Sequence, residues 1–110
     1  MTINEMVKQS HANAIAKGWH DEQRTFGELI ALCHSELSEA LEAYRDGVPA
    51  NITYFNEGSA KPEGIPSELA DVLIRVADMC GLYDIDLEAI VKEKMWYNST
   101  RERRHGGKVI

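Results

Sequence analysis

Apolar positions along this chain follow the three- and four-residue spacing of amphipathic helices. The clearest such segment runs from residue 25 to residue 47. Its apolar positions are Phe26, Leu29, Ile30, Cys33, Leu37, Ala40, Leu41 and Tyr44. A Thr25-x-x-Glu28 capping box predicts where this helix begins, and Gly47 predicts its end. A second capping box, Thr2-x-x-Glu5, predicts an earlier helix that ends near Gly18.

Two more helices follow a long irregular connection. Residues 47–66 hold all three prolines, so we expect a loop there that acts as a lid or sets base selectivity. Ser67 predicts the start of a third helix, which runs to about Gly81, and either Asp84 or Asp86 caps a fourth. No strand-like period of two stands out. The pattern predicts an all-α, four-helix-type bundle in one domain, residues 1–110.

The third helix is apolar nearly all round. Its polar positions form one narrow stripe: Glu68, Asp71, Arg75 and Asp78. A helix of this kind is normally buried, so we expect a homodimer or homotetramer to complete the bundle, although a partner within the chain would satisfy the same pattern. On this stripe, Arg75 either pairs with Asp71 or Asp78 or serves a substrate.

Composition narrows the class of protein. The chain is 44% hydrophobic and 27% charged, and no apolar run approaches the roughly 20 residues of a membrane span. The N-terminus has no secretory signal pattern, so we expect a cytoplasmic protein. A net charge of -6 opposes nonspecific nucleic-acid binding. The end of the chain is basic, at Arg101, Arg103, Arg104 and Lys108, which suits either phosphates or an ordinary helix end.

The two cysteines and the four histidines limit the redox chemistry. Cys33 and Cys80 lie among apolar residues, which favours reduced core thiols over a disulfide. Di-iron bundles carry Glu-x-x-His motifs, whereas the residues three positions after Glu36 and Glu68 are Glu39 and Asp71, so iron chemistry is disfavoured.

Two pairs of acidic residues are the candidate chemistry. Glu36 and Glu39 lie one turn apart, and so do Glu68 and Asp71. Residues at i and i+3 lie about 60° apart on a helix, so each pair could grip one ion. Carboxylate oxygen suits Mg²⁺ or Mn²⁺, with phosphates as further ligands. The alternative is that both pairs mark ordinary solvated faces.

The segments "SELSEALEAYR", "KPEGIPSELADVLIRVADMCG" and "KEKMWYNSTRERRHGGK" resemble the MazG-like all-α nucleoside triphosphate pyrophosphohydrolases. The likeness covers nearly the whole chain. The signature of that superfamily, Glu-x-x-Glu followed by Glu-x-x-Asp, is matched by Glu36, Glu39, Glu68 and Asp71. The resemblance implies a helical bundle in which these four residues bind Mg²⁺ and a (d)NTP is cleaved between its α and β phosphates.

The resemblance also implies roles for residues outside the signature. Either Glu36 or Glu39 would orient or deprotonate the attacking water. In similar proteins, positions like Lys94 and Asn98 approach the phosphates, and Arg101 extends that face by one turn. His11 and Trp19 look like positions that line the nucleoside side of the pocket. Trp19 would stack on a base, or it would be a core or interface aromatic.

Two other functions remain open from the sequence. The chain would be a noncatalytic helical module that assembles through its apolar faces, with the acidic stripe serving solubility. Alternatively, it would hydrolyse another phosphoanhydride such as phosphoribosyl-ATP, whose hydrolase shares the superfamily.

Overall fold

The computed structural model describes residues 1–101 and is mostly helical. The helices are α1 (Ile3–Ala16), α2 (Phe26–Arg45), α3 (Ile65–Leu82) and α4 (Leu87–Thr100). Both predicted capping boxes are confirmed. The hydroxyls of Thr2 and Thr25 accept from the backbone N–H three residues on, and the Glu5 and Glu28 side chains accept from the backbone N–H of those threonines. Local sequence therefore fixes where α1 and α2 begin.

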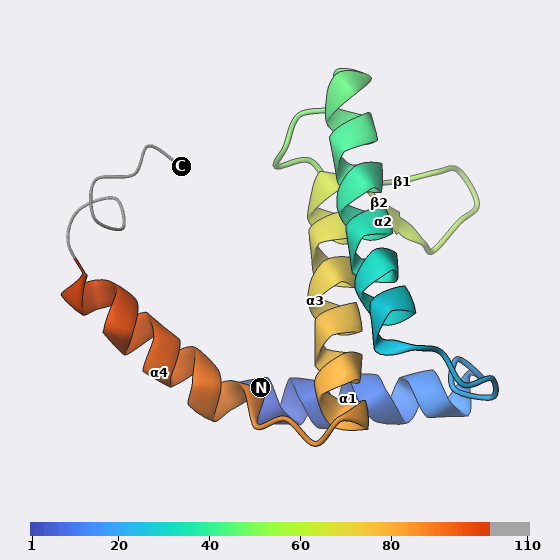
Figure 1. The fold of residues 1–110 in the computed structure, drawn as a ribbon. Coiled ribbons are helices and arrows are strands. Elements are labelled where there is room, and N and C mark those ends of the chain that lie inside the picture. The colour runs from blue at the N-terminus through green and yellow to red at the C-terminus, as the bar shows by residue number, and fades with distance from the viewer. Residues whose placement is uncertain (102–110) are drawn as a thin grey trace.

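The helices α2 and α3 form an antiparallel pair, and α1 crosses one end of it (Figure 1). The fourth helix extends away from this pair, and its main contacts are with α1. Hydrogen bonds at the start of α4 hold it there: Asn4 Nδ2 donates to Asp86 Oδ1, and the Glu88 N–H donates to Asn4 Oδ1. The packed part of the bundle is thus made by α1, α2 and α3.

The start of α3 differs from the prediction. The helix begins at Ile65 and its N-cap is Gly64, so the prediction that Ser67 caps it was wrong. The Ser67 hydroxyl instead donates to the Pro62 carbonyl. Gly64 has φ 111° and ψ 171°, a conformation open almost only to glycine, and a Cβ there would lie 2.3 Å from the Ile52 carbonyl oxygen. Close approach of the loop backbone therefore decides where α3 begins.

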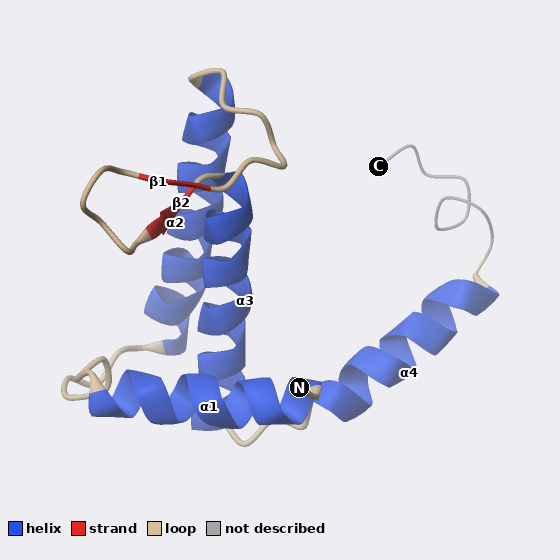
Figure 2. Ribbon diagram, turned by 180° about the vertical axis from the view of Figure 1, so that it is seen from behind, coloured by secondary structure: helices blue, strands red, loops and turns tan. Residues whose placement is uncertain are grey.

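The connection between α2 and α3 contains a small hairpin that the sequence did not predict. Two-residue strands, β1 (Tyr54–Phe55) and β2 (Pro62–Glu63), pair antiparallel, with Tyr54 opposite Glu63. Figure 2 shows the hairpin beside the α2–α3 pair, away from α1. Strands this short carry no readable period of two, which explains why the sequence pattern missed them.

The fourth helix is capped by Asp86, one of the two candidates. Its carboxylate accepts from the Ala89 N–H, whereas Asp84 has a positive φ of 55°. The basic residues Arg103, Arg104 and Lys108 lie outside the described part of the chain.

The core is small and lies where the three packed helices meet. Val7, Ala77 and Cys80 form one buried cluster, and Leu29, Cys33 and Met79 form another. Both cysteines are buried free thiols, as predicted, and burial raises the pKa of each.

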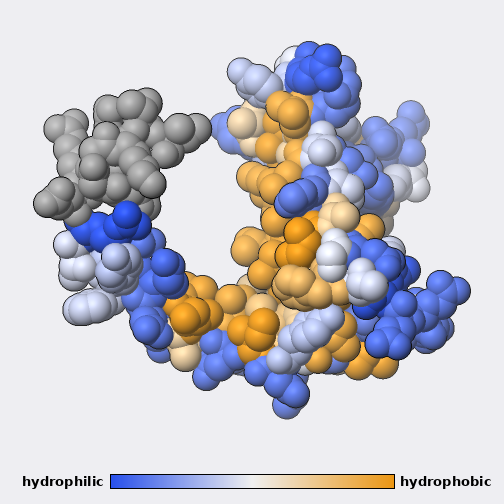
Figure 3. Space-filling model, viewed as in Figure 1, coloured by the Kyte–Doolittle hydropathy of each residue, from blue (hydrophilic) through white to orange (hydrophobic). Residues whose placement is uncertain are grey.

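Large apolar side chains remain at the surface of α2, α3 and α4. On α3, Leu69, Leu73 and Ile74 are 48%, 57% and 48% exposed, although this helix was expected to be buried. Figure 3 shows apolar side chains gathered along the side of α3 that faces α4. Within residues 1–101 no helix combines the length and the hydropathy needed to cross a membrane. Within residues 1–101, much of the apolar surface of α3 is thus left without a partner.

Candidate functional site

The structure brings three of the four predicted metal ligands together. Glu36 and Glu39 on α2 and Glu68 on α3 each offer a carboxylate oxygen, and these oxygens all lie within 4.8 Å of one another. Glu36 is buried, Glu68 is half-buried and Glu39 is exposed. The antiparallel packing of α2 against α3 makes this cluster, because it sets the middle of α2 beside the first turns of α3.

Glu68 occupies the least favourable electrostatic environment described for this carboxylate cluster. Burial and the nearby Glu39 and Glu36 raise its pKa from 4.5 to about 7. Its Oε2 atom is buried and has no hydrogen-bond partner among the described residues. Ionised carboxylates only accept hydrogen bonds. Glu36 or Glu39 can therefore bond to the Glu68 oxygen only when one of the two carboxyl groups in the contact carries a proton. A cation would satisfy it as well.

Arg75 makes an unexpected ion pair with the cluster. Its Nε–H donates to Glu36 Oε1 at 2.8 Å, in a contact where the two side chains are only 26% and 11% exposed. Of the alternatives that the sequence left open for Arg75, an ion pair with Asp71 or Asp78 is therefore not the one that forms. Burial alone would raise the pKa of Glu36, but the hydrogen bond from Arg75 leads the effects that lower it overall.

Asp71, the fourth predicted ligand, lies at the edge of the cluster. It is half-buried, and burial together with the charge of Glu36 raises its pKa. The charges of Arg75 and of Lys61, on the hairpin loop, act in the opposite direction. Lys61 makes its ion pair with Glu63 at 3.3 Å. The 47–66 connection therefore places a cation near the carboxylates.

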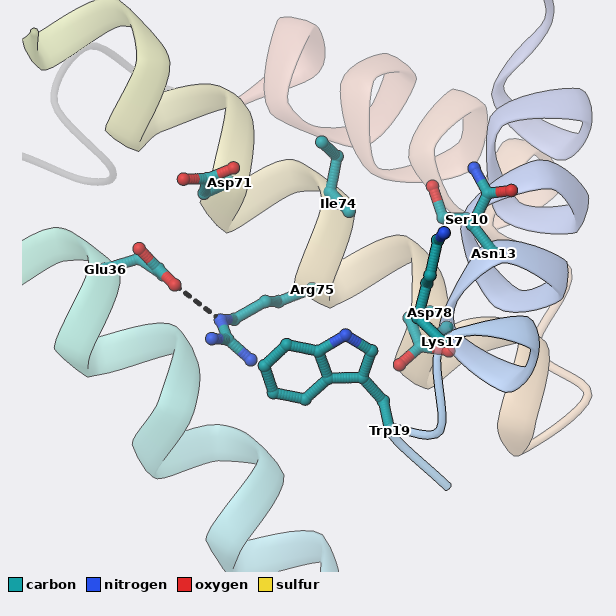
Figure 4. Close-up of a pocket in the computed structure, with 10 residues that line it drawn as sticks. Ser10, Asn13, Lys17, Trp19, Glu36, Asp71, Ile74, Arg75 and Asp78 are labelled. Carbon is teal, nitrogen blue, oxygen red and sulfur yellow. Dashed lines mark hydrogen bonds and ion pairs between the residues drawn. The ribbon is translucent and has the colours of Figure 1, made fainter. Parts of the chain in front are cut away.

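A cavity of about 390 Å³ lies beside the cluster. Its lining includes both acidic and basic groups and one large aromatic ring: Ser10, Asn13, Ala14, Lys17, Trp19, Glu36, Asp71, Ile74, Arg75 and Asp78. Figure 4 shows Arg75 between the Glu36 carboxylate and the Trp19 ring. The guanidinium carbon of Arg75 lies 5.4 Å from the centre of that ring, within cation–π range. Trp19 is thus a cavity-lining aromatic, 48% exposed.

His11 faces a carboxylate instead of the cavity. Its Nδ1 lies 2.8 Å from Asp78 Oδ1, and His20 Nε2 lies 2.9 Å from each oxygen of the same carboxylate. These are hydrogen-bond distances, and because an ionised carboxylate only accepts hydrogen bonds, each imidazole donates where Asp78 is ionised. The network joins α1 and the turn after it to α3, and it supports the wall of the cavity that Asp78 lines.

The residues predicted on the fourth helix are not brought to the carboxylates. Lys94 and Asn98 are exposed on α4, and Arg101 is exposed at its C-cap. Lys94 and Arg101 both lie 5.5 Å from the centre of the Tyr97 ring. Because α4 packs mainly on α1, these cations lie apart from the site in the single chain (Figure 1).

The sequence interpretation missed several groups at the site. Lys17 and Asn13 line the cavity from α1 and its C-cap, while His20 joins Asp78. None of them belongs to a spacing motif, and helical spacing alone does not show which face of α1 meets α3. Asp78 was already visible on the polar stripe of the third helix, without an assigned role.

Comparison with family models, with curated proteins and with solved structures gave no match for this chain.

Proposed function

We propose that this protein is an Mg²⁺-dependent nucleoside triphosphate pyrophosphohydrolase of the MazG-like type. It would convert a (d)NTP to the monophosphate and pyrophosphate and so remove unwanted nucleotides. The observation that carries the proposal is the carboxylate cluster of Glu36, Glu39 and Glu68 beside a cavity lined by Trp19 and Arg75.

The residues of the cluster fit a hard divalent cation. Three carboxylates converge, and the buried Glu68 Oε2 lacks a partner among the residues described. Oxygen donors of this kind favour Mg²⁺ or Mn²⁺ over softer metals. Asp71 would join through its carboxylate from the next turn of α3. When bound, Mg²⁺ would neutralise phosphoryl charge and activate water.

The protein's own groups would bind and orient the substrate. The Trp19 ring offers a stacking surface for a base, and Lys17 and Arg75 offer positive charge to phosphates in the same cavity. Glu39 is the most exposed of the three carboxylates, so it can reach a water as a general base, the role also open to Glu36.

Oligomerisation forms part of the proposal. The exposed apolar residues of α2 and α3 support a homodimer or homotetramer. Lys94 and Asn98 would then meet the phosphates either from a second copy or after movement of α4, since in one chain α4 lies on α1.

The first experiment is product identification. The purified protein is incubated with Mg²⁺ and a panel of canonical, deoxy and oxidised nucleoside triphosphates, and the products are separated by ion exchange. Monophosphate plus pyrophosphate supports the proposal. Turnover of phosphoribosyl-ATP alone would favour that hydrolase, and no turnover by folded, metal-loaded protein would favour the noncatalytic assembly module.

Two substitutions test the site itself. Glu39→Gln and Asp71→Asn remove a charged ligand without changing size, so turnover should fall by at least about 100-fold. Helical circular dichroism should remain intact in both. The matched control is Glu42→Gln on the exposed side of α2, which should keep wild-type turnover. Retained activity in both site variants would contradict the assignment.

A further inference from the structure

Arg75 has two partners at the candidate site, and each belongs to a different part of it. Its Nε–H is 2.8 Å from Glu36 Oε1, at the carboxylate cluster. Its guanidinium carbon is 5.4 Å from the centre of the Trp19 ring, at the cavity. The side chain therefore bridges the two parts, as Figure 4 shows.

The contact with Glu36 competes directly with a cation. Glu36 is the most buried carboxylate of the cluster, and Arg75 is the cation that it contacts among residues 1–101. A guanidinium and a divalent cation on the same carboxylate repel each other strongly in a partly buried site. Binding of one therefore weakens binding of the other.

The Arg75 guanidinium lies over the Trp19 ring, which is 48% exposed and lines the cavity, so it occupies part of the surface on which a base would stack. A base can stack on the indole only where no other group covers it. Arg24 also approaches this ring, at 5.9 Å, but it is held by a hydrogen bond to the Trp19 carbonyl and makes no ion pair with the cluster in the described chain. Among the described residues, Arg75 alone links the ring to a carboxylate of the cluster.

We propose that Arg75 is a positioning residue that couples the carboxylate cluster to the base-stacking face of Trp19. A divalent cation on Glu36 displaces the guanidinium, and the displaced side chain uncovers the indole. Metal binding and base stacking then favour each other, because each benefits from the departure of Arg75. This inference rests on the proposed metal site, and it adds a coupling between metal binding and base stacking at that site.

The test follows Trp19 fluorescence in a Trp96→Phe background, where Trp19 is the remaining tryptophan. Mg²⁺ is added to the nucleotide-free protein, and acrylamide quenching and calorimetric Mg²⁺ affinity are measured. With Arg75 present, Mg²⁺ should increase quenching of Trp19. With Arg75→Met, quenching should be high from the start and unaffected by Mg²⁺, and Mg²⁺ should bind about 5-fold to 10-fold more tightly.

The control separates coupling from loss of a nearby charge. Lys61→Met also removes a cation near the carboxylates, but Lys61 pairs with Glu63 and is not among the cations within range of the Trp19 ring. It should keep the response of Trp19 to Mg²⁺. A second variant, Glu36→Gln, weakens the Arg75 contact from the other side and should raise quenching without metal. Circular dichroism checks the fold of each variant.

A nucleoside without phosphates provides the second measurement. It cannot ligate the metal through phosphate, so any effect of Mg²⁺ on its affinity reports coupling through the protein. Mg²⁺ should strengthen nucleoside binding when Arg75 is present and leave it unchanged in Arg75→Met.

Failure of the inference can be told from failure of the proposed function. If Mg²⁺ does not bind the wild-type protein, the proposed metal site is wrong and the inference is overturned with it. If Mg²⁺ binds but Trp19 quenching does not respond, or responds equally in Arg75→Met, the coupling alone is overturned.

Discussion

Glu68 shows what a single residue contributes to this site. Burial and the two neighbouring carboxylates, which oppose its charge, raise the pKa of Glu68 from the ordinary value of 4.5 to about 7. Its ionisation therefore costs folding free energy, and the buried Oε2 atom is left unsatisfied. A cation at the proposed metal site would remove this cost.

The same residue gives a prediction for the metal-free protein. The folded state binds the Glu68 proton more tightly than the unfolded state does, so its contribution to stability is greatest below pH 4.5 and is lost as the pH rises through about 7. Glu68→Gln should raise the melting temperature at pH 8 and leave it nearly unchanged at pH 5. Thermal unfolding in a chelator checks this.

The control for this prediction is Glu42→Gln, an exposed glutamate of α2, which should show no such pH dependence. Addition of Mg²⁺ at pH 8 should make the wild-type melting temperature the higher of the two. The intact cluster should bind Mg²⁺ more tightly than the Glu68→Gln cluster, and so should gain more stability from it. An equal change in melting temperature at both pH values would contradict the cost assigned to Glu68.

At the scale of the elements, the close approach of α1 to α3 supports the cavity. Gly81 lies on α3 where His11 of α1 crosses it, and a Cβ at Gly81 would lie 2.5 Å from the Cβ of His11. Real Cβ atoms do not come so close, so the glycine allows this crossing. The His11–Asp78 hydrogen bond lies one turn away and depends on the same approach.

Gly81→Ala should therefore destabilise the protein by about 1–3 kcal/mol, the usual cost of overpacking. The matched control is Gly27→Ala on α2, where the new Cβ would meet Thr25 Oγ1 at an ordinary 3.9 Å. Urea denaturation gives both values. Unchanged stability in Gly81→Ala would show that α1 and α3 are free to separate.

At the scale of the whole molecule, the exposed apolar surface is the main unexplained feature. The core contains no large side chain that is fully buried, in the part of the chain described, while Leu41 of α2 and Leu73 of α3 are 59% and 57% exposed. Apolar surface gathered in this way marks association sites in soluble proteins. We expect a second copy to cover it.

Size-exclusion chromatography with light scattering tests this expectation. The wild-type protein should have the mass of a dimer or tetramer at micromolar concentration, and Leu73→Glu should shift it toward the monomer. Ile15→Glu, at an exposed apolar residue of α1, is the control and should keep the oligomer. A monomeric wild-type protein would contradict the oligomeric part of the proposal.

Much of the local structure was predictable from the sequence. Two capping boxes, helical spacing and a loop rich in proline placed α1, α2 and the 47–66 connection, because these signals act over three or four residues. The spacing of the acidic pairs also predicted that Glu36 lies one turn from Glu39 and that Glu68 lies one turn from Asp71, each pair on one helix.

Only the tertiary structure decided which groups meet across helices. It paired Arg75 with Glu36 instead of Asp71 or Asp78, turned His11 toward Asp78, and set α4 against α1. It also set the start of α3 at Ile65, after the N-cap Gly64, where the backbone of Ile52 leaves no room for a side chain. These outcomes depend on how each helix is rotated and crossed in the packed molecule, which local spacing does not specify.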